Sequence, residues 1–398
     1  MNKESKIKLL ILITLLGFIC SCIFHYYVGA FKGNSYPLNT FLFKPIDSFT
    51  DFTSLYDNPT SSSYFPFANL LIHGFSHIKT YTISFLLFMS LSLISIFYYF
   101  MINMSDLKRI DSITYSLIFS LFSFPFLFLF CRANNESLVY ISLCLFIYNY
   151  EKGKKTLAII GLSCAIAMKL YPAVFLILLF SYKEYKQIFY TLILVFILTI
   201  VSIWMLYGGI SDYLILYKQN VNGYQELYVI QNWGLDYGHS LFNCIKETFF
   251  MSSIFFIKPY LYIVTILTIL ISTYVVFIEK IFWKRVTLLV IMICLLPYVS
   301  ADYKLIHFFI PILLFINCKN RTFLTLDLKL KGKIMKKSII FDYCFIILFG
   351  LLIIPKNYRL FKDLYDGVII DPIIMLILLF LIVFSSFSER KSIDKISI

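Results

Sequence analysis

The chain has 398 residues, of which 60% are hydrophobic and only 14% are charged, and its mean hydropathy is +0.83. Soluble domains are about one quarter charged, so this composition excludes a soluble protein and indicates an integral membrane protein. A net charge of +13 would suit a nucleic-acid-binding protein, but the basic residues lie in connections between apolar segments. We therefore expect membrane lipids, and no nucleic acid, as partners of the positive charge.

The apolar segments predict an all-α polytopic membrane protein with about 12 transmembrane segments, forming one membrane domain over residues 1–398. The first segment is long and no small-x-small cleavage site follows it, so we expect an uncleaved helix. In chain order the segments lie at about 9–29, 80–103, 113–131, 137–150, 156–168, 172–181, 188–207, 259–278, 286–299, 305–317, 339–354 and 369–386.

The distribution of the 35 Lys and Arg residues predicts the orientation of the chain. Most of them lie in connections on one side, in stretches such as EKGKK at 151–155 and LKLKGKIMKK at 328–337. Because basic loops stay in the cytoplasm, we expect both termini to be cytoplasmic in a plasma (inner) membrane protein. The outer connections then lie at about 30–79, 208–258 and 355–368. Cys131 and Cys244 both fall on the outer side, and whether they pair stays open.

Three consecutive segments, at 137–150, 156–168 and 172–181, are unusually short. Helices of these lengths span only about 15–21 Å, whereas the hydrocarbon core is about 30 Å thick. Basic residues fix their inner ends, so the missing length falls at the outer ends. We infer a pit in the outer leaflet, because charge and irregular backbone are tolerated at that depth only where they line a cavity.

Polar side chains collect at the outer ends of the predicted segments, on the side of this pit. The inner side offers Lys and Arg but no comparable mixture of acid, amide and imidazole groups. The outer set contains Asp47, Asp51, Asp57, Arg132, Asn134, Asn135, Glu136, Lys169, Tyr171, His239, Asn243, Asp302, Lys304 and His307.

Each of these residues also has a structural interpretation. Asp51 could cap a helix, and Arg132 with Glu136 could form an i,i+4 ion pair. Lys169 could extend its ammonium outward to water. If Lys169 is buried instead, it needs an anion, and Glu136 and a lipid phosphate are the two candidates. The convergence of so many polar residues favours a functional site over these separate interpretations.

The residue types favour sugar transfer from a lipid-linked phosphate donor. The sequence contains no Gly-rich phosphate loop and no HExxH, paired CxxC or GxSxG motif. Recessed cations, for which we expect Lys169, Arg132 and Lys304, can neutralise a leaving phosphate. A partly desolvated carboxylate can act as base toward an acceptor hydroxyl. We expect no cofactor and no metal.

Five stretches, in order over about residues 45–315, resemble the family-87 glycosyltransferases, a membrane branch of the GT-C superfamily that includes mannosyltransferases dependent on polyprenyl-phosphate mannose. The first is DFTSLYD followed by YFPFANLL, in which Asp51, Tyr56, Tyr64 and Pro66 match the first-loop pattern. The others are RANNESLVY at 132–140, GLSCAIAMKLYP at 161–172, HSLFNCI at 239–245 and YVSADYKLIHFFIPILL at 298–314. The chain departs from the family at ADYK, where Trp or His is frequent, and at NNE, where Gly-Asn or Gly-Gln is frequent.

The resemblance implies an inverting, metal-independent hexosyltransferase that uses a polyprenyl-phosphate-linked sugar on the extracytoplasmic face. The acceptor would be a glycan or glycolipid of a surface polysaccharide pathway, and Asp51 would be the general base. We expect the substrates to contact Tyr56, Tyr64, Asn135, Glu136, Tyr171, His239, Asn243, Asp302 and His307. The alternatives are an O-antigen or polysaccharide polymerase, and a lipid-linked glycan flippase or transporter. The few outer arginines and the absence of a visible repeat weigh against these alternatives.

Overall fold

A computed structural model describes residues 1–32, 50–58, 60, 64–78, 80–233, 235–249, 253–318, 328–356, 358 and 366–394. Within these ranges the chain is almost entirely helical, and its only β-type pairing is an isolated bridge between Gly238 and Ala301. The predicted all-α class is therefore confirmed. Asp47 and much of the first and third predicted outer connections lie outside the described residues.

Eleven helical elements make up the first half of the chain. They are α1 (Lys3–Lys32), α2 (Thr50–Asp57), α3 (Pro66–Ser76), α4 (Tyr81–Asn103), α5 (Arg109–Phe122), α6 (Phe124–Arg132), α7 (Glu136–Glu151), α8 (Lys155–Met168), the 3-10 helix η3 (Tyr171–Phe175), α9 (Leu176–Ser181) and α10 (Tyr185–Tyr207).

The second half contains more irregular helix. Its elements are α11 (Ile210–Tyr224), the π-helix η4 (Gln225–Ile230), the 3-10 helix η5 (Leu235–Tyr237), α12 (Leu241–Phe249), α13 (Ser253–Thr273), the π-helix η6 (Tyr274–Ile278), α14 (Phe282–Leu295), the 3-10 helix η7 (Asp302–Phe308), α15 (Phe309–Asn317), α16 (Leu328–Ile353) and α17 (Gly367–Asp394).

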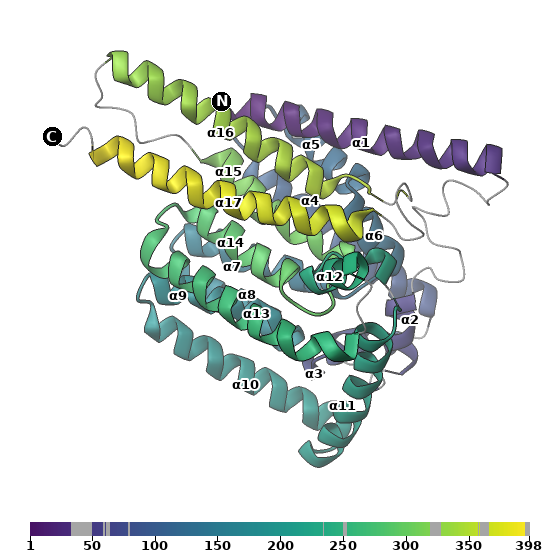
Figure 1. The fold of residues 1–398 in the computed structure, drawn as a ribbon. Helices are drawn as coiled ribbons and strands as arrows, with labels where there is room; N and C mark the ends of the chain where they lie inside the picture. Colours follow the sequence, from purple (N-terminus) through teal and green to yellow (C-terminus); the bar gives the residue numbers. More distant parts are fainter. Residues whose placement is uncertain are drawn as a thin grey trace.

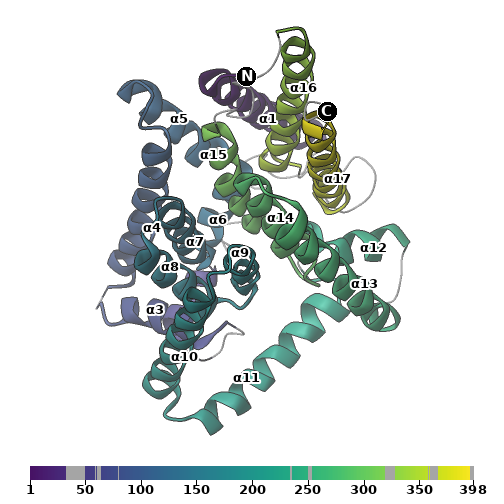
Figure 2. The ribbon, with the colours of Figure 1, turned by 90° about the vertical axis from the view of Figure 1, so that its left-hand side faces the viewer.

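The long helices form layers. Helices α1, α16 and α17 lie along one side of the molecule, and α8, α10 and α13 lie toward the opposite side (Figure 1). In the turned view, α4, α7, α8 and α10 form one group, while α14 and α13 lead away from it (Figure 2). Helix α11 crosses between α10 and α13 at one end. Helices α14 and α15 are almost wholly buried in the central core between these groups.

Five helices in the described ranges are long and apolar enough to cross a membrane. The count rises to six if α5 and α6, which are bent by 61° at their junction, form one span. These helices identify a multi-pass membrane protein, but they do not confirm the predicted count of about 12 spans. The remaining predicted segments correspond to shorter helices, among them α7 with 16 residues and α8 with 14.

The pair α7 and α8 packs closely because of one glycine. A Cβ atom added at Gly161 would lie 2.7 Å from the backbone nitrogen of Phe146 and 2.8 Å from the carbonyl oxygen of Ser142. No larger residue fits there without moving the α7 backbone, and small residues at helix contacts serve this purpose in membrane proteins. The close contact fixes the outer ends of α7 and α8 relative to each other. The thiols of Cys131 and Cys244 are both free.

Candidate functional site

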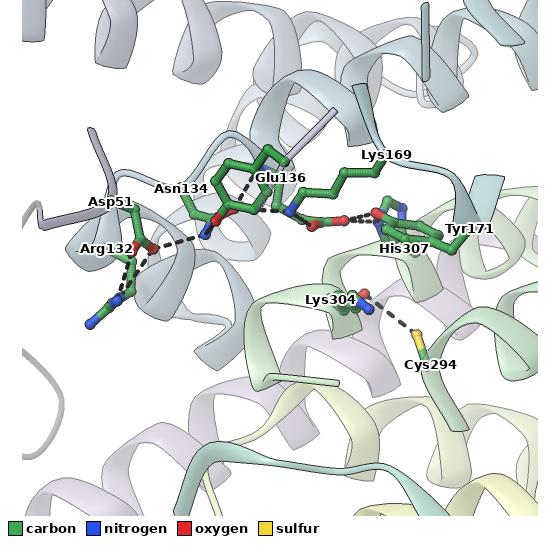
Figure 3. A network of polar contacts seen from close by, with 10 residues as sticks. Asp51, Arg132, Asn134, Glu136, Lys169, Tyr171, Cys294, Lys304 and His307 are labelled. Carbon is green, nitrogen blue, oxygen red and sulfur yellow. Dashed lines mark hydrogen bonds and ion pairs between the residues drawn. The ribbon is translucent and has the colours of Figure 1, made fainter. Parts of the chain in front are cut away.

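Backbone breaks between short helices bring the site residues together. Helix α6 ends because Ala133 adopts the left-handed conformation, with φ 47° and ψ 44°, and α7 begins at Glu136. Helix α8 ends because Lys169 adopts an extended conformation, with φ −147° and ψ 141°. Polar residues at such breaks point into the space between helices. Residues of α2, the α6–α7 turn, the α8–η3 junction and η7 therefore meet in one network (Figure 3).

Asp51 of α2 lies at one end of this network. Its carboxylate accepts two hydrogen bonds from the Arg132 guanidinium, at 2.6 Å from Nη2 and 3.1 Å from Nε. The side-chain amide of Asn134 donates a third hydrogen bond, at 2.8 Å. The side chains of Asp51 and Arg132 are 15% and 28% exposed, so this end of the network is open to an incoming molecule.

Glu136 lies at the other end and has no solvent exposure. Its Oε2 atom is 2.6 Å from the Lys169 ammonium, and its Oε1 atom is 2.7 Å from Nε2 of His307. The Tyr171 hydroxyl also donates to Oε1 and lies 3.1 Å from the same histidine nitrogen. A carboxylate removed from water needs this number of partners to remain charged.

Asn134 joins the two ends. Its Nδ2 group donates to Asp51 and, at 3.1 Å, to the Tyr64 hydroxyl. Its Oδ1 atom accepts from the backbone N–H of Glu136 at 2.8 Å and from Lys169 at 3.4 Å. The polar chain from Asp51 to His307 is therefore continuous, so a change at one end alters the hydrogen bonding of the other.

Lys304 differs from the other two cations of the site. Its ammonium lies 4.6 Å from the centre of the Tyr171 ring, and only 9% of the residue is exposed. Arg132 and Lys169 each have a carboxylate partner, but no hydrogen bond or ion pair of the Lys304 ammonium occurs within the described chain. The site therefore contains a buried cation that lacks an anion.

Asn135 also lacks partners. It is 1% exposed, and neither its side-chain nitrogen nor its oxygen has a hydrogen-bond partner among the described residues. The Nδ1 atom of His307 is in the same condition. Buried polar atoms are rarely left unsatisfied, so such groups are suited to hydrogen-bond a substrate hydroxyl.

Four predicted site residues do not join this network. Tyr56 donates to the Ile78 carbonyl at 3.2 Å and packs against Phe52 beneath Asp51. Nδ1 of His239 lies 3.2 Å from the Asp302 carboxylate. Asn243 packs against Gly238, where an added Cβ atom would lie 1.9 Å from its Nδ2 atom. The predicted contact of these four residues with substrate is untested, and their present contacts position the loop and η7.

The second group has its own electrostatics. Burial raises the pKa of Asp302 to about 7 and lowers the pKa of His239 to about 3. Nε2 of the same imidazole lies 2.9 Å from the Ser300 hydroxyl. These contacts hold the start of η7, two residues before Lys304.

Two features of the site differ from the sequence analysis or were missed by it. Arg132 and Glu136 lie in different helices because Ala133 ends α6, so the proposed i,i+4 interpretation is wrong and Arg132 pairs with Asp51 instead. Tyr303 was not predicted, although its ring centre lies 5.6 Å from the Lys169 ammonium. Its position between Asp302 and Lys304 was the one available signal.

The fold and site define a helical membrane protein with a buried acid–base network at the ends of short helices. The sequence profile described as Glycosyltransferase family 87 matches residues 63–300, more than half of the chain. The chain belongs to this family, which makes it a membrane glycosyltransferase. The matched range includes Arg132, Glu136 and Lys169 but not Asp51 or Lys304. No curated protein and no solved structure matched the chain.

The Lys169–Glu136 pair gives a testable expectation about stability. Lys169→Met should lower the free energy of unfolding by about 3 kcal/mol, because it leaves the Glu136 carboxylate buried without its main counter-charge. Glu136→Gln added to this variant should restore much of the loss by removing the uncompensated charge. Thermal and chemical unfolding in detergent would measure both effects.

The matched control is Lys155→Met. Lys155 forms an ion pair of similar length, 2.7 Å, with Glu184, but its side chain is 52% exposed. This substitution should cost less than about 1 kcal/mol. Equal losses in the two lysine variants, or no restoration by Glu136→Gln, would contradict the assignment of Glu136 as the partner that stabilises Lys169.

Proposed function

We propose that the protein transfers a sugar from a polyprenyl-phosphate donor to a glycan or glycolipid acceptor on the extracytoplasmic face of the membrane. The observation that carries this proposal is the buried ammonium of Lys304, which has no anion within the described chain. A buried cation is costly unless an anion neutralises it, and a donor phosphate would supply that anion. Family membership supports the sugar transfer itself.

In this proposal Asp51 is the general base. It accepts the proton of the acceptor hydroxyl, whose oxygen attacks the anomeric carbon of the donor sugar with inversion. The bond between that carbon and the phosphate oxygen breaks, and the polyprenyl phosphate leaves with the electron pair. The Arg132 ion pair favours the charged form of Asp51, so the carboxylate is ready to accept a proton. Its partial exposure places it where the acceptor can approach.

The other predicted residues take supporting roles. Lys304 stabilises the negative charge that develops on the leaving phosphate, and Lys169 contributes at longer range from its pair with Glu136. Arg132 holds Asp51 and can also reach the donor phosphate. Asn135 offers its unpaired amide to a sugar hydroxyl.

The role of Asp51 is tested by Asp51→Asn. This change keeps the side-chain volume but removes the basic carboxylate, so sugar transfer should fall by at least about 100-fold. Transfer from a radiolabelled polyprenyl-phosphate sugar in proteoliposomes would measure it, with the unfolding temperature as a check on folding. Asp57→Asn, at an exposed position of the same helix, is the control and should keep near-normal transfer. Near-normal transfer by Asp51→Asn would remove Asp51 as base.

The orientation is tested by cysteine labelling in a variant that lacks the nine native cysteines. A cysteine at the exposed Asn58 should react with a membrane-impermeant maleimide from outside intact cells, and a cysteine at the exposed Lys154 should not. The physical reason is the concentration of basic residues in EKGKK. The reverse labelling pattern would contradict both the orientation and the extracytoplasmic site.

The role of Lys304 is tested by comparing two substitutions. Lys304→Met should slow transfer by about 100-fold and weaken binding of polyprenyl phosphate, because it removes the counter-charge of the leaving group. Lys304→Arg keeps the charge and should lose much less activity. Lys258→Met, at an exposed lysine of α13, is the control. Equal activity of Lys304→Met and Lys304→Arg in folded protein would remove Lys304 from the donor site.

A further inference from the structure

Two apolar hollows lie outside the polar network. The first has a volume of about 240 Å³ and lies between η3, α13 and α14, where Tyr171, Val174, Val264 and Leu296 are among the residues that line it. The second has a volume of about 430 Å³ and lies between α9, α10, α13 and η6. Leu176, Phe180, Ser272 and Phe277 contribute to its walls.

The two hollows follow one another along the same pair of elements. On α13 and η6, the first hollow uses residues 260–268 and the second uses residues 272–277. On the facing side, the first uses residues up to Val174 and the second begins at Leu176. Helical rise over residues 260–277 gives a length of about 25 Å, close to the hydrocarbon thickness of a bilayer. We call this continuous feature the α9–α13 seam.

The seam opens toward the membrane. Its bounding helices α10 and α13 are the least buried of the candidate spans, with 17% of each apolar window buried. In the turned view these two helices diverge, and α11 crosses between them at one end (Figure 2). A lipid chain can therefore move sideways from the bilayer into the seam without passing through water.

One end of the seam reaches the polar network. Tyr171 lines the first hollow with its ring, and its hydroxyl donates to Glu136. The Lys304 ammonium lies 4.6 Å from the centre of the same ring. The seam thus joins an apolar surface of membrane length to a buried cation that lacks an anion. A molecule that matches both parts has one long hydrocarbon chain and a phosphate at its end.

We propose that the α9–α13 seam binds the isoprenoid chain of the donor and places its phosphate against Lys304. This inference rests on the proposed function for the identity of the lipid. A single narrow seam between two helices suits one chain, whereas a phospholipid brings two. The rings of Tyr260, Tyr298 and Phe277 along the seam offer flat surfaces to the unsaturated isoprene units.

Photo-crosslinking tests the seam without requiring catalysis. The probe is a sugar-free polyprenyl phosphate that carries a diazirine in its isoprenoid chain, added to the full-length protein in nanodiscs. Labelled peptides should come from residues 174–180 and 264–277. Val264→Trp and Ser272→Trp fill the two hollows and should each reduce this labelling by about tenfold. Ile266→Trp is the matched control, since Ile266 lies on the same helix but is 57% exposed and lines neither hollow.

The outcomes separate this inference from the proposed function. Labelling elsewhere, equal labelling in Val264→Trp and Ile266→Trp, or equal competition by unlabelled phosphatidic acid and polyprenyl phosphate would overturn the seam assignment. Normal sugar transfer by both filled variants would also overturn it while leaving the glycosyltransferase proposal intact. Seam labelling in a protein that transfers no sugar from any polyprenyl-phosphate donor would have the opposite meaning, because the lipid site would stand and the proposed function would fail.

Discussion

The buried charge of Glu136 is the constraint on which the site depends. Its carboxylate has no exposure, and its three partners come from α8, η3 and η7. Removing a carboxylate from water costs several kcal/mol, so the fold must keep these elements in place together. The left-handed residue before α7 and the extended residue after α8 are the backbone features that make this possible. The ends of the short helices are therefore tied together by electrostatics as well as by packing.

The charges of the site do not balance within the described chain, and this imbalance has a direction. Asp51 and Glu136 each have a close cationic partner, and both partners are connected through Asn134. Lys304 is the additional cation, on the side of Tyr171 that faces the apolar seam. The paired charges keep the acidic groups in position, while the unpaired charge remains available to a ligand. This division explains how one cluster can serve both stability and binding.

The sequence predicted the components of the site better than their partners. Apolar run lengths predicted three short consecutive helices, since a run of residues has a length whatever it packs against. The sequence also offered Glu136 as one of two candidate partners of Lys169, because a buried cation needs an anion. It did not predict the pairing of Arg132 with Asp51, 81 positions apart, or of His307 with Glu136, 171 positions apart. Such pairs depend on helix packing, and no local spacing encodes them. The i,i+4 interpretation of Arg132 failed because one left-handed residue, Ala133, interrupts the helix.

Membrane depth connects the polar network to the seam. Short helices place the network below the level that longer helices would reach, where the dielectric constant is low and charge interactions are strong. An anion held there is bound more firmly than at the surface, but it must also be brought there. Crossing from water would require stripping the phosphate of its hydration, whereas a lipid-anchored phosphate already lies at the interface and needs only lateral movement. A recessed cation and a membrane-facing apolar seam are thus complementary, because each makes the other useful only for a ligand that carries both a hydrocarbon chain and a charge.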